Sequence, residues 1–212
     1  MTRQCVTSGS SLPPKAMPSL SLRQLRYHTR NVLQCVLIEI HEHAANWRTP
    51  KDRYLLEQLA DRIQRSVAIA DTLFGVTSEP GPFAERLHTL CHGILALFSD
   101  PAQHLRFDIS VEGTCPPDLE MPALRATHEL VGNAVKHGMR MRLQGHVAVS
   151  LTGSNDGVML VVADDGWELT HLDNTGEGLG LARDLAEQFH GTLSVERRRD
   201  NTIATIILRT MK

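Results

Sequence analysis

Residues 128–138 read His-Glu-Leu-Val-Gly-Asn-Ala-Val-Lys-His-Gly, and their spacing predicts a helix with one polar stripe. Glu129 and Asn133 are four residues apart. Lys136 and His137 follow about one turn later, so a helix stacks these side chains on one face. A carboxylate, an amide oxygen and cations in one stripe suit a hydrated Mg²⁺ ion and a polyphosphate. Taken alone, the stripe also fits a helix whose polar face is simply solvated.

Two glycine-containing motifs follow this stretch in the chain. Residues 161–166 (Val-Val-Ala-Asp-Asp-Gly) predict a strand that runs into an acidic turn, and residues 176–182 (Gly-Glu-Gly-Leu-Gly-Leu-Ala) predict a glycine-rich loop that opens a helix. In this order, the three stretches resemble the N, G1 and G2 boxes of the GHKL ATPases. That superfamily includes sensor histidine kinases, Hsp90-like chaperones, DNA gyrase B and MutL. The resemblance implies an ATP-binding fold that uses ATP together with Mg²⁺.

The resemblance also implies a role for each polar residue of the N box. Asn133 matches the asparagine that places its amide oxygen on Mg²⁺. Glu129 matches the glutamate that acts as a base or organises water near the γ-phosphate, and Lys136 or His137 would contact phosphate. Glu129 could instead be only a charge on a helix surface, but three matching boxes in the right order favour the nucleotide site.

In the G1 box, Asp164 matches the aspartate that accepts a hydrogen bond from the adenine amino group. A carboxylate committed to this contact rejects guanine, whose carbonyl offers no donor there. Gly166 would keep the wall beside the base open. The G2 residues whose backbone would approach the phosphates, where a helix points its N–H groups at them, are Gly176, Gly178, Leu179 and Gly180.

The G1 box departs from the usual family pattern, Asp-x-Gly-x-Gly. Here it reads Asp-Asp-Gly-Trp-Glu, so Glu168 occupies the position of the second glycine and adds a charge near the nucleotide. The stretch between the two glycine boxes is also short, which predicts a small ATP lid.

The N-terminal part of the chain predicts two long helices joined by a short turn. Apolar residues recur at three- and four-residue spacing in 22–40 and again in 54–74. Thr49 is placed to cap the second helix with Pro50 at its first position, and Gly75 ends it. Two helices with broad apolar stripes bury little by themselves. Pairing with a second copy in a four-helix bundle therefore predicts a homodimer through this helical hairpin.

A helical hairpin before the ATPase domain indicates a histidine kinase, because chaperones and topoisomerases do not place one there. In histidine kinases its first helix carries the phosphoacceptor, and His28, followed by Asn31 and Leu33, resembles such a box. The nearest subfamily is the HWE-like group with His-Arg-x-Lys-Asn-Asn-Leu-Gln. Alignment of residues 30–34 to that motif puts Tyr27 at the histidine position, about 100° from His28 around a helix.

The order of predicted elements gives an α+β chain whose sheet has its helices on one side, which fits the two-layer sandwich of the GHKL (Bergerat) fold. We divide it into a disordered tail (1–18), a dimerisation and phosphotransfer hairpin (19–76), a linker (77–82) and a catalytic ATP-binding domain (83–212). No sensor domain is predicted, so input would come from a separate sensor protein, or the chain is a fragment of a longer kinase.

Composition excludes several other classes of protein. With a formal net charge of −2, the chain gives no electrostatic argument for nucleic-acid binding. It has no apolar run of the roughly 20 residues that a membrane span needs. Its four cysteines form no CxxC pair, which is typical of reduced thiols in a cytoplasmic protein.

The sequence therefore predicts a soluble histidine kinase that phosphorylates its own His28 and passes the phosphate to an aspartate in a response regulator receiver domain. Three alternatives stay open. A histidine phosphotransferase with a kinase-like fold would relay phosphate between receiver domains. A serine kinase of the anti-sigma-factor type shares the ATPase fold but lacks the hairpin. A non-catalytic scaffold would use the hairpin only to bind a partner, and His28 would be an ordinary surface histidine.

Overall fold

In the computed structural model of the protein, the described residues are 19–46, 49–75, 81–166 and 177–210, without the side chains of 19–26, 28 and 177. The predicted tail, most of the predicted linker and the segment between the two glycine boxes lie outside these ranges. Among the helices within the described ranges, none has the length and apolar character that crossing a membrane requires.

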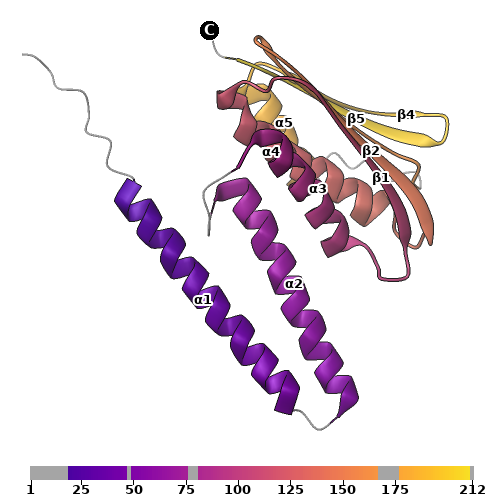
Figure 1. Ribbon diagram of the computed structural model, residues 1–212. Coiled ribbons are helices and arrows are strands. Elements are labelled where there is room, and N and C mark those ends of the chain that lie inside the picture. The colour runs from indigo at the N-terminus through magenta and orange to yellow at the C-terminus, as the bar shows by residue number, and fades with distance from the viewer. Residues whose placement is uncertain (1–18, 47–48, 76–80, 167–176, 211–212) are drawn as a thin grey trace, which may run out of the picture.

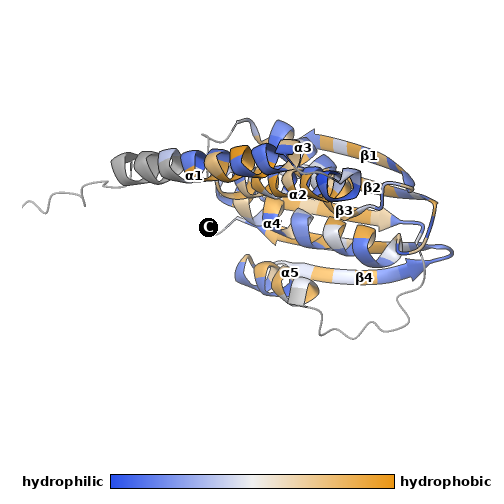
Figure 2. Ribbon diagram, turned by 90° about the horizontal axis from the view of Figure 1, so that it is seen from below, coloured by the Kyte–Doolittle hydropathy of each residue, from blue (hydrophilic) through white to orange (hydrophobic). Residues whose placement is uncertain are grey.

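A mixed β-sheet forms one layer of the molecule, and helices pack against one of its faces as the second layer (Figures 1 and 2). The strand order is β1-β2-β3-β5-β4, in which β1 and β2 are parallel and the other neighbours are antiparallel. The strands are β1 (His104–Gly113), β2 (Gln144–Ser154), β3 (Gly157–Asp164), β4 (Thr192–Arg198) and β5 (Asn201–Arg209). The helices of the second layer are α3 (Phe83–Phe98), α4 (Pro117–Asn133) and α5 (Glu177–Gln188). The predicted α+β class is confirmed.

Alternation along the strands decides which side chains face the helices. Val149 of β2 is opposite Val162 of β3, which is opposite Ala204 of β5, and all three are buried. The helices close this core from the other side with fully buried residues such as Ile94. The same alternation places Asp164, the last residue of β3, on the helix-facing side of the sheet.

The helix that carries the N box changes its pitch within the box. α4 ends at Asn133, and the backbone continues as a π-helical turn, η1 (Ala134–Gly138). The amide of Met139 donates to the carbonyl of Ala134 at 3.0 Å, five residues back. Because a π turn is wider than an α turn, residues after Asn133 leave the stripe that a continuous α-helix predicts.

Two long helices, α1 (Ser19–Asn46) and α2 (Pro50–Phe74), lie antiparallel beside each other and project from the sheet layers (Figure 1). α2 begins as the sequence predicts, because the Thr49 side chain accepts a hydrogen bond from the amide of Asp52. It also ends as predicted, at Gly75, which adopts the left-handed conformation with φ 58°.

The C-terminal half of α2 belongs to the same hydrophobic core as the sheet and its helices. Ile69 and Leu73 are both buried in that core. Gly93 of α3 allows the two helices to approach, since a Cβ there would lie 3.1 Å from Cγ1 of Ile69. The N-terminal half of α2 extends away from the core. Its exposed large apolar residues are Tyr54, Leu55 and Leu59.

A buried arginine fastens α2 to this core. Arg86 of α3 is 8% exposed, and its Nε and Nη2 atoms donate to the carbonyl of Thr72, near the end of α2, at 3.2 and 3.0 Å. Its Nη1 atom lies 3.4 Å from the carboxylate of Glu120 on α4. One side chain therefore satisfies a carbonyl near a helix end and links three helices.

We expect Arg86→Leu to lower the free energy of unfolding by about 2–4 kcal/mol, because a carbonyl and a carboxylate lose their buried donor. Urea denaturation followed by circular dichroism measures this change. Arg53→Leu is the matched control, because Arg53 pairs with Glu57 on the exposed surface of α2, and its loss should cost no more than about 0.5 kcal/mol. Equal losses for the two variants would contradict this role of Arg86.

Candidate functional site

The N box, the end of β3 and the start of α5 meet at a cavity of about 30 Å³ between the sheet and the helices. Motifs that are far apart in the sequence thus converge on one place. The residues that line the cavity are Leu130, Asn133, Ala134, Gly138, Val162, Asp164, Leu179, Val195, Thr202 and Ala204.

Asp164 is the buried carboxylate of this cavity, with 6% of its surface exposed. Its Oδ1 accepts a hydrogen bond from the amide of Gly166 at 3.0 Å. Glycine is required on both sides of this contact: a Cβ on Gly138 would collide with Asp164 Oδ1, and a Cβ on Gly166 would collide with the carbonyl of Gly138. The backbone therefore closes tightly around the carboxylate.

Burial raises the pKa of the Asp164 carboxyl from 3.8 to about 6. Desolvation is the largest cause. The hydrogen bond from Gly166 and the positive charges of Arg197 and Arg142 lower the pKa, whereas the neighbouring Asp165 raises it. A donor from a ligand would favour the ionised form of such a carboxylate, so its environment suits it to accept a hydrogen bond from an amino group.

Residues of the N and G2 boxes also meet next to Asn133, which lines the cavity. Glu129 and Asn133 lie one turn apart on α4, and Gly178 near the start of α5 packs against both. A Cβ on Gly178 would lie 2.6 Å from Oε2 of Glu129 and 3.5 Å from the amide atoms of Asn133. The second carboxylate oxygen of Glu129, Oε1, lies 2.9 Å from Nδ1 of His128. A carboxylate and an amide therefore stand beside the N-terminal end of a helix.

The donor set of this cavity fits an adenine nucleotide. It offers a buried carboxylate for an amino group, apolar walls for a base, oxygen ligands for a hydrated Mg²⁺ and a helix N-terminus for phosphate. Its volume of about 30 Å³ is a tenth of the roughly 300 Å³ of a small ligand pocket. The half-buried Leu179 forms the wall contributed by α5. A base therefore needs more space than the cavity has in this structure.

Lys136 and His137 do not line the cavity in this structure, and both are exposed. The ammonium group of Lys136 lies 3.9 Å from the centre of the Phe98 ring, at the end of α3. The π turn after Asn133 explains this placement, because it takes both residues off the predicted stripe. A contact between either residue and phosphate stays a prediction.

Several residues singled out in the sequence are not placed at the site. Gly176 and Glu168 lie outside the described residues. His28 is part of α1, but its side chain is not described. Gly180 lies on α5 with nothing within 4 Å of a Cβ, and the approach of its backbone to phosphate stays a prediction.

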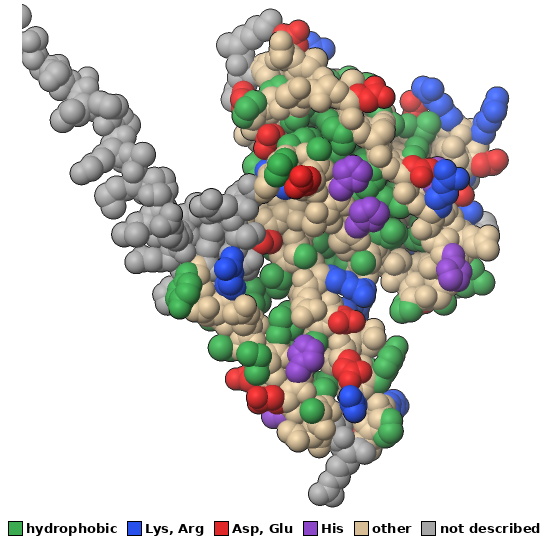
Figure 3. Space-filling model, viewed as in Figure 1, with side chains coloured by type: hydrophobic (Ala, Val, Ile, Leu, Met, Phe, Trp, Pro, Cys, Tyr) green, Lys and Arg blue, Asp and Glu red, His purple; other side chains and the backbone are tan. Residues whose placement is uncertain are grey.

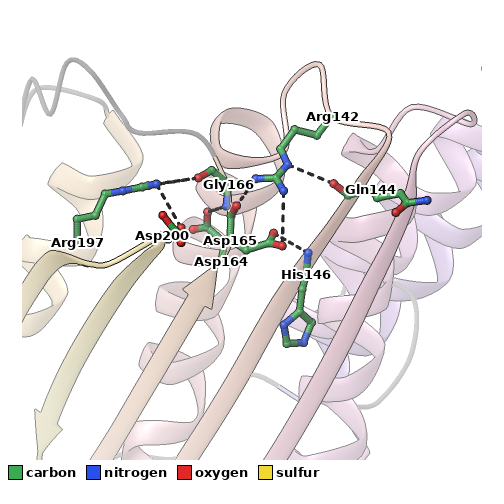
Figure 4. A network of polar contacts seen from close by, with 8 residues as sticks. All are labelled: Arg142, Gln144, His146, Asp164, Asp165, Gly166, Arg197 and Asp200. Atoms are coloured by element: carbon green, nitrogen blue, oxygen red, sulfur yellow. Dashed lines mark hydrogen bonds and ion pairs between the residues drawn. The ribbon is translucent and has the colours of Figure 1, made fainter.

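Two arginines that the sequence did not single out hold the acidic turn from both sides (Figure 4). Arg197 of β4 donates to the carbonyl oxygen of Gly166 at 3.2 and 3.3 Å. Arg142, in the loop before β2, donates to the main-chain oxygen of Asp165 and lies 3.6 Å from its carboxylate. No local sequence signal marks Arg197, because only the order of the strands brings it to this turn.

No protein-family model and no curated protein matches this chain. Solved structures do match it. The histidine kinase domain of the blue-light-activated histidine kinase EL346 from Erythrobacter litoralis is 18% identical, with a TM-score of 0.56 over 84% of this chain and 95% of that domain. The longer EL346 chain gives a TM-score of 0.54, and 59% of it is covered. A bacterial phosphotransferase is 14% identical, with a TM-score of 0.52 over 91% of this chain and 98% of that protein.

At these identities the similarity is one of fold. Residues 83–212 number 130 of 212, or about 61%, so a match over 84% includes part of the two N-terminal helices. The chain therefore has the fold of a histidine kinase domain.

Proposed function

We propose that the chain is a histidine kinase that binds ATP with Mg²⁺ and transfers the γ-phosphoryl group to His28. The observation that carries this proposal is that Asp164 and Asn133 line one cavity at the start of α5, where Gly178 packs against Glu129. The fold supports it, because it is that of a histidine kinase domain. Asn133, Asp164 and Leu179, one residue from each of the stretches that resemble the three ATPase boxes, line the same cavity.

Each of these side chains has a physical role in the proposal. Asp164 accepts a hydrogen bond from the adenine amino group, and Asn133 offers its amide oxygen to Mg²⁺, which offsets phosphate charge when bound. Glu129 takes a proton or orients water near the reacting phosphate. A ring nitrogen of His28 forms a bond to the γ-phosphorus while the bond to the leaving ADP oxygen breaks. Catalysis then rests mainly on positioning and on neutralisation of charge.

A groove between the hairpin and the sheet domain supports transfer from this site to α1. Its volume is about 630 Å³, and Phe98, over which Lys136 lies, forms part of its wall. Leu33 brings α1, the helix of His28, into the same groove. The helix of His28 and the end of α3, which Lys136 contacts, therefore line one groove. The other lining residues are Arg62, Ile63, Ser66, Val67, Ala70 and Leu97.

The proposed function includes a homodimer formed through the hairpin, and a response regulator receiver domain as the phosphate acceptor. Apolar side chains lie exposed along the hairpin (Figure 3). Two hairpins packed together would bury them in a four-helix bundle. A mass of one chain in light scattering at micromolar concentration would contradict the dimer. The exposed apolar residues concerned are Val32, Val36, Ile38, Tyr54, Leu55 and Leu59.

A histidine phosphotransferase that relays phosphate between receiver domains is the second candidate. Two observations favour it. The fold is similar to that of a bacterial phosphotransferase over 91% of this chain. The cavity beside Asp164 is small, with Leu179 in its wall. In this function, the hairpin exchanges phosphate through His28 without ATP.

Incubation of the purified chain with γ-labelled ATP and Mg²⁺ separates these functions. For a kinase we expect label that is lost in acid, kept in alkali and absent from His28→Ala, because phosphohistidine is the only labelled species. His41→Ala is the matched control, since His41 lies further along α1 on its exposed surface and should keep the full signal.

The other outcomes point elsewhere. Label that persists in His28→Ala overturns His28 as the acceptor, and acid-stable label indicates a serine kinase. Absence of label from ATP, with label gained from a phosphorylated receiver protein, indicates the phosphotransferase. Absence of label from both sources indicates a scaffold.

A further inference from the structure

Arg197 lies directly across the strands of the sheet from Asp164, with Thr202 between them. Arg197 of β4 is opposite Thr202 of β5, and Thr202 is opposite Asp164 of β3, so all three side chains stand on the helix-facing side of the sheet. Arg198, the next residue of β4, points to the other side, and both arginines are exposed. Because of this alternation, Arg197 and not Arg198 points towards the acidic turn at residues 164–166.

The guanidinium group of Arg197 is fixed by hydrogen bonds. Nη1 and Nη2 donate to the carbonyl oxygen of Gly166 at 3.2 and 3.3 Å (Figure 4). Nη1 also donates to Oγ1 of Thr202, and Nη2 to the main-chain oxygen of Asp200, both at 3.2 Å. Gly166 in turn donates its amide to Oδ1 of Asp164 at 3.0 Å. Arg197 therefore holds the residue that holds the buried carboxylate.

Charged groups face Asp164 from two further places. Arg142, in the loop before β2, brings a second positive charge. Asp165 brings a negative charge, and its Oδ1 accepts a hydrogen bond from the amide of His146 at 2.8 Å. Among the described residues, the helix-side lining of the cavity carries no charge. Those lining residues are Leu130, Asn133, Ala134, Gly138 and Leu179.

The neighbouring charges that act on Asp164 are therefore those of Arg197, Arg142 and Asp165. Glu129 of α4 does not line the cavity and stands against Gly178. The pKa of Asp164 is about 6, mainly through desolvation, and Arg197 is the larger of the two cationic contributions that lower it. Loss of the Arg197 charge therefore raises the pKa of Asp164.

We propose that Arg197 is a positioning residue that sets the base selectivity of the nucleotide site, by holding Gly166 and keeping Asp164 an ionised hydrogen-bond acceptor. This inference rests on the proposed ATP site. An ionised carboxylate accepts from the amino group of adenine and has nothing to donate to the carbonyl of guanine. A protonated carboxyl donates as well, so loss of Arg197 admits guanine.

The size of the effect follows from the titration of Asp164. With a pKa of about 6, roughly a tenth of the carboxyl is protonated at pH 7. If loss of Arg197 made the Asp164 carboxyl a tenfold weaker acid, about half of it would be protonated at pH 7. The population of the ionised form, which accepts adenine, then falls about twofold. The population of the protonated form, which accepts guanine, rises about fivefold. The ratio of the two affinities should therefore fall about tenfold.

Titration of the full chain with ADP and with GDP, each with Mg²⁺, between pH 5 and 8.5 tests this inference. For wild type we expect ADP affinity to fall as the pH drops through about 6. For Arg197→Met and Arg197→Gln we expect this fall at a higher pH, together with about a tenfold lower preference for ADP over GDP at pH 7. Arg197→Lys keeps the charge, so its pH midpoint should stay near that of wild type. Arg198→Met removes an equal charge on the opposite side of β4 and should change neither property.

Each result decides one point. A uniform loss of affinity for both nucleotides, with an unshifted pH midpoint, would show that Arg197 is merely structural and would overturn the inference alone. Failure of wild type to bind either nucleotide would overturn the proposed function and the inference together. If Arg197→Met does not fold, Arg197→Gln and Arg197→Lys still decide between charge and structure, because the inference requires the pH midpoints of these two variants to differ.

Discussion

Asp164→Asn is expected to weaken the binding of ADP with Mg²⁺ about 100-fold, because a charge-assisted hydrogen bond of about 2–3 kcal/mol is lost. The same change should raise the free energy of unfolding at pH 7.5 by about 1–3 kcal/mol. The wild-type carboxyl is 6% exposed, and its pKa is raised from 3.8 to about 6. Ionised Asp164 therefore destabilises the folded state, whereas a neutral amide of the same shape does not.

The sign of this effect changes with pH in a defined way. A carboxyl whose folded-state pKa is raised favours the folded state fully below pH 3.8, and this contribution is lost as the pH rises through about 6. The stability difference between Asp164→Asn and wild type should therefore shrink as the pH falls from 6 towards 4. Thermal unfolding across this range, together with calorimetric titration of ADP, measures both effects.

Asp165→Asn provides the matched control, one residue further along the chain. Its Oδ1 accepts a hydrogen bond from the amide of His146 at 2.8 Å, and Arg142 lies 3.6 Å from its carboxylate. Loss of this charge should lower stability by about 1 kcal/mol, the opposite sign from Asp164→Asn. Unchanged ADP binding by Asp164→Asn in a folded protein would contradict the role of Asp164 as the adenine acceptor.

The parts of the site that the sequence predicted are those that short stretches of chain determine. Glu129 and Asn133 meet because they are one helical turn apart, and Asp164 and Gly166 meet because a turn follows a strand. The limits of α2 were also predictable, since Thr49 and Gly75 act within one turn of the helix ends.

The parts of the site and fold that could not be predicted depend on which strands pair, or on which part of a helix packs against the core. Arg197 reaches Gly166 only because β5 pairs on one edge with β3 and on the other with β4. The apolar stripe of α2 reads as one surface in the sequence. In the structure Leu73 joins the main core whereas Leu55 is exposed, because only the C-terminal half of α2 packs on α3. Lys136 leaves the polar stripe through a π turn, which no local sequence pattern indicates.

The two glycines on α5 should respond differently to the same substitution. A Cβ on Gly178 would lie 2.6 Å from Oε2 of Glu129, whereas a Cβ on Gly180 meets nothing within 4 Å. The tip of a glutamate side chain can move, so Gly178→Ala should still fold. Glu129 would be displaced, however, and we expect the rate of phosphoryl transfer from ATP to fall about 100-fold, because small displacements of a positioned group have effects of this size.

Gly180→Ala should instead raise the free energy of unfolding by up to about 1 kcal/mol, because alanine replaces glycine within a helix and no contact is disturbed. Initial rates of label incorporation and urea denaturation on both variants separate the two effects. Asp184→Ala, on the exposed face of α5, controls for general changes in that helix. Equal transfer rates for Gly178→Ala and Gly180→Ala would mean that the position of Glu129 does not limit the chemistry. A large loss confined to Gly178→Ala would tie the rate to the point where α4 and α5 meet, which is where the proposed mechanism requires it.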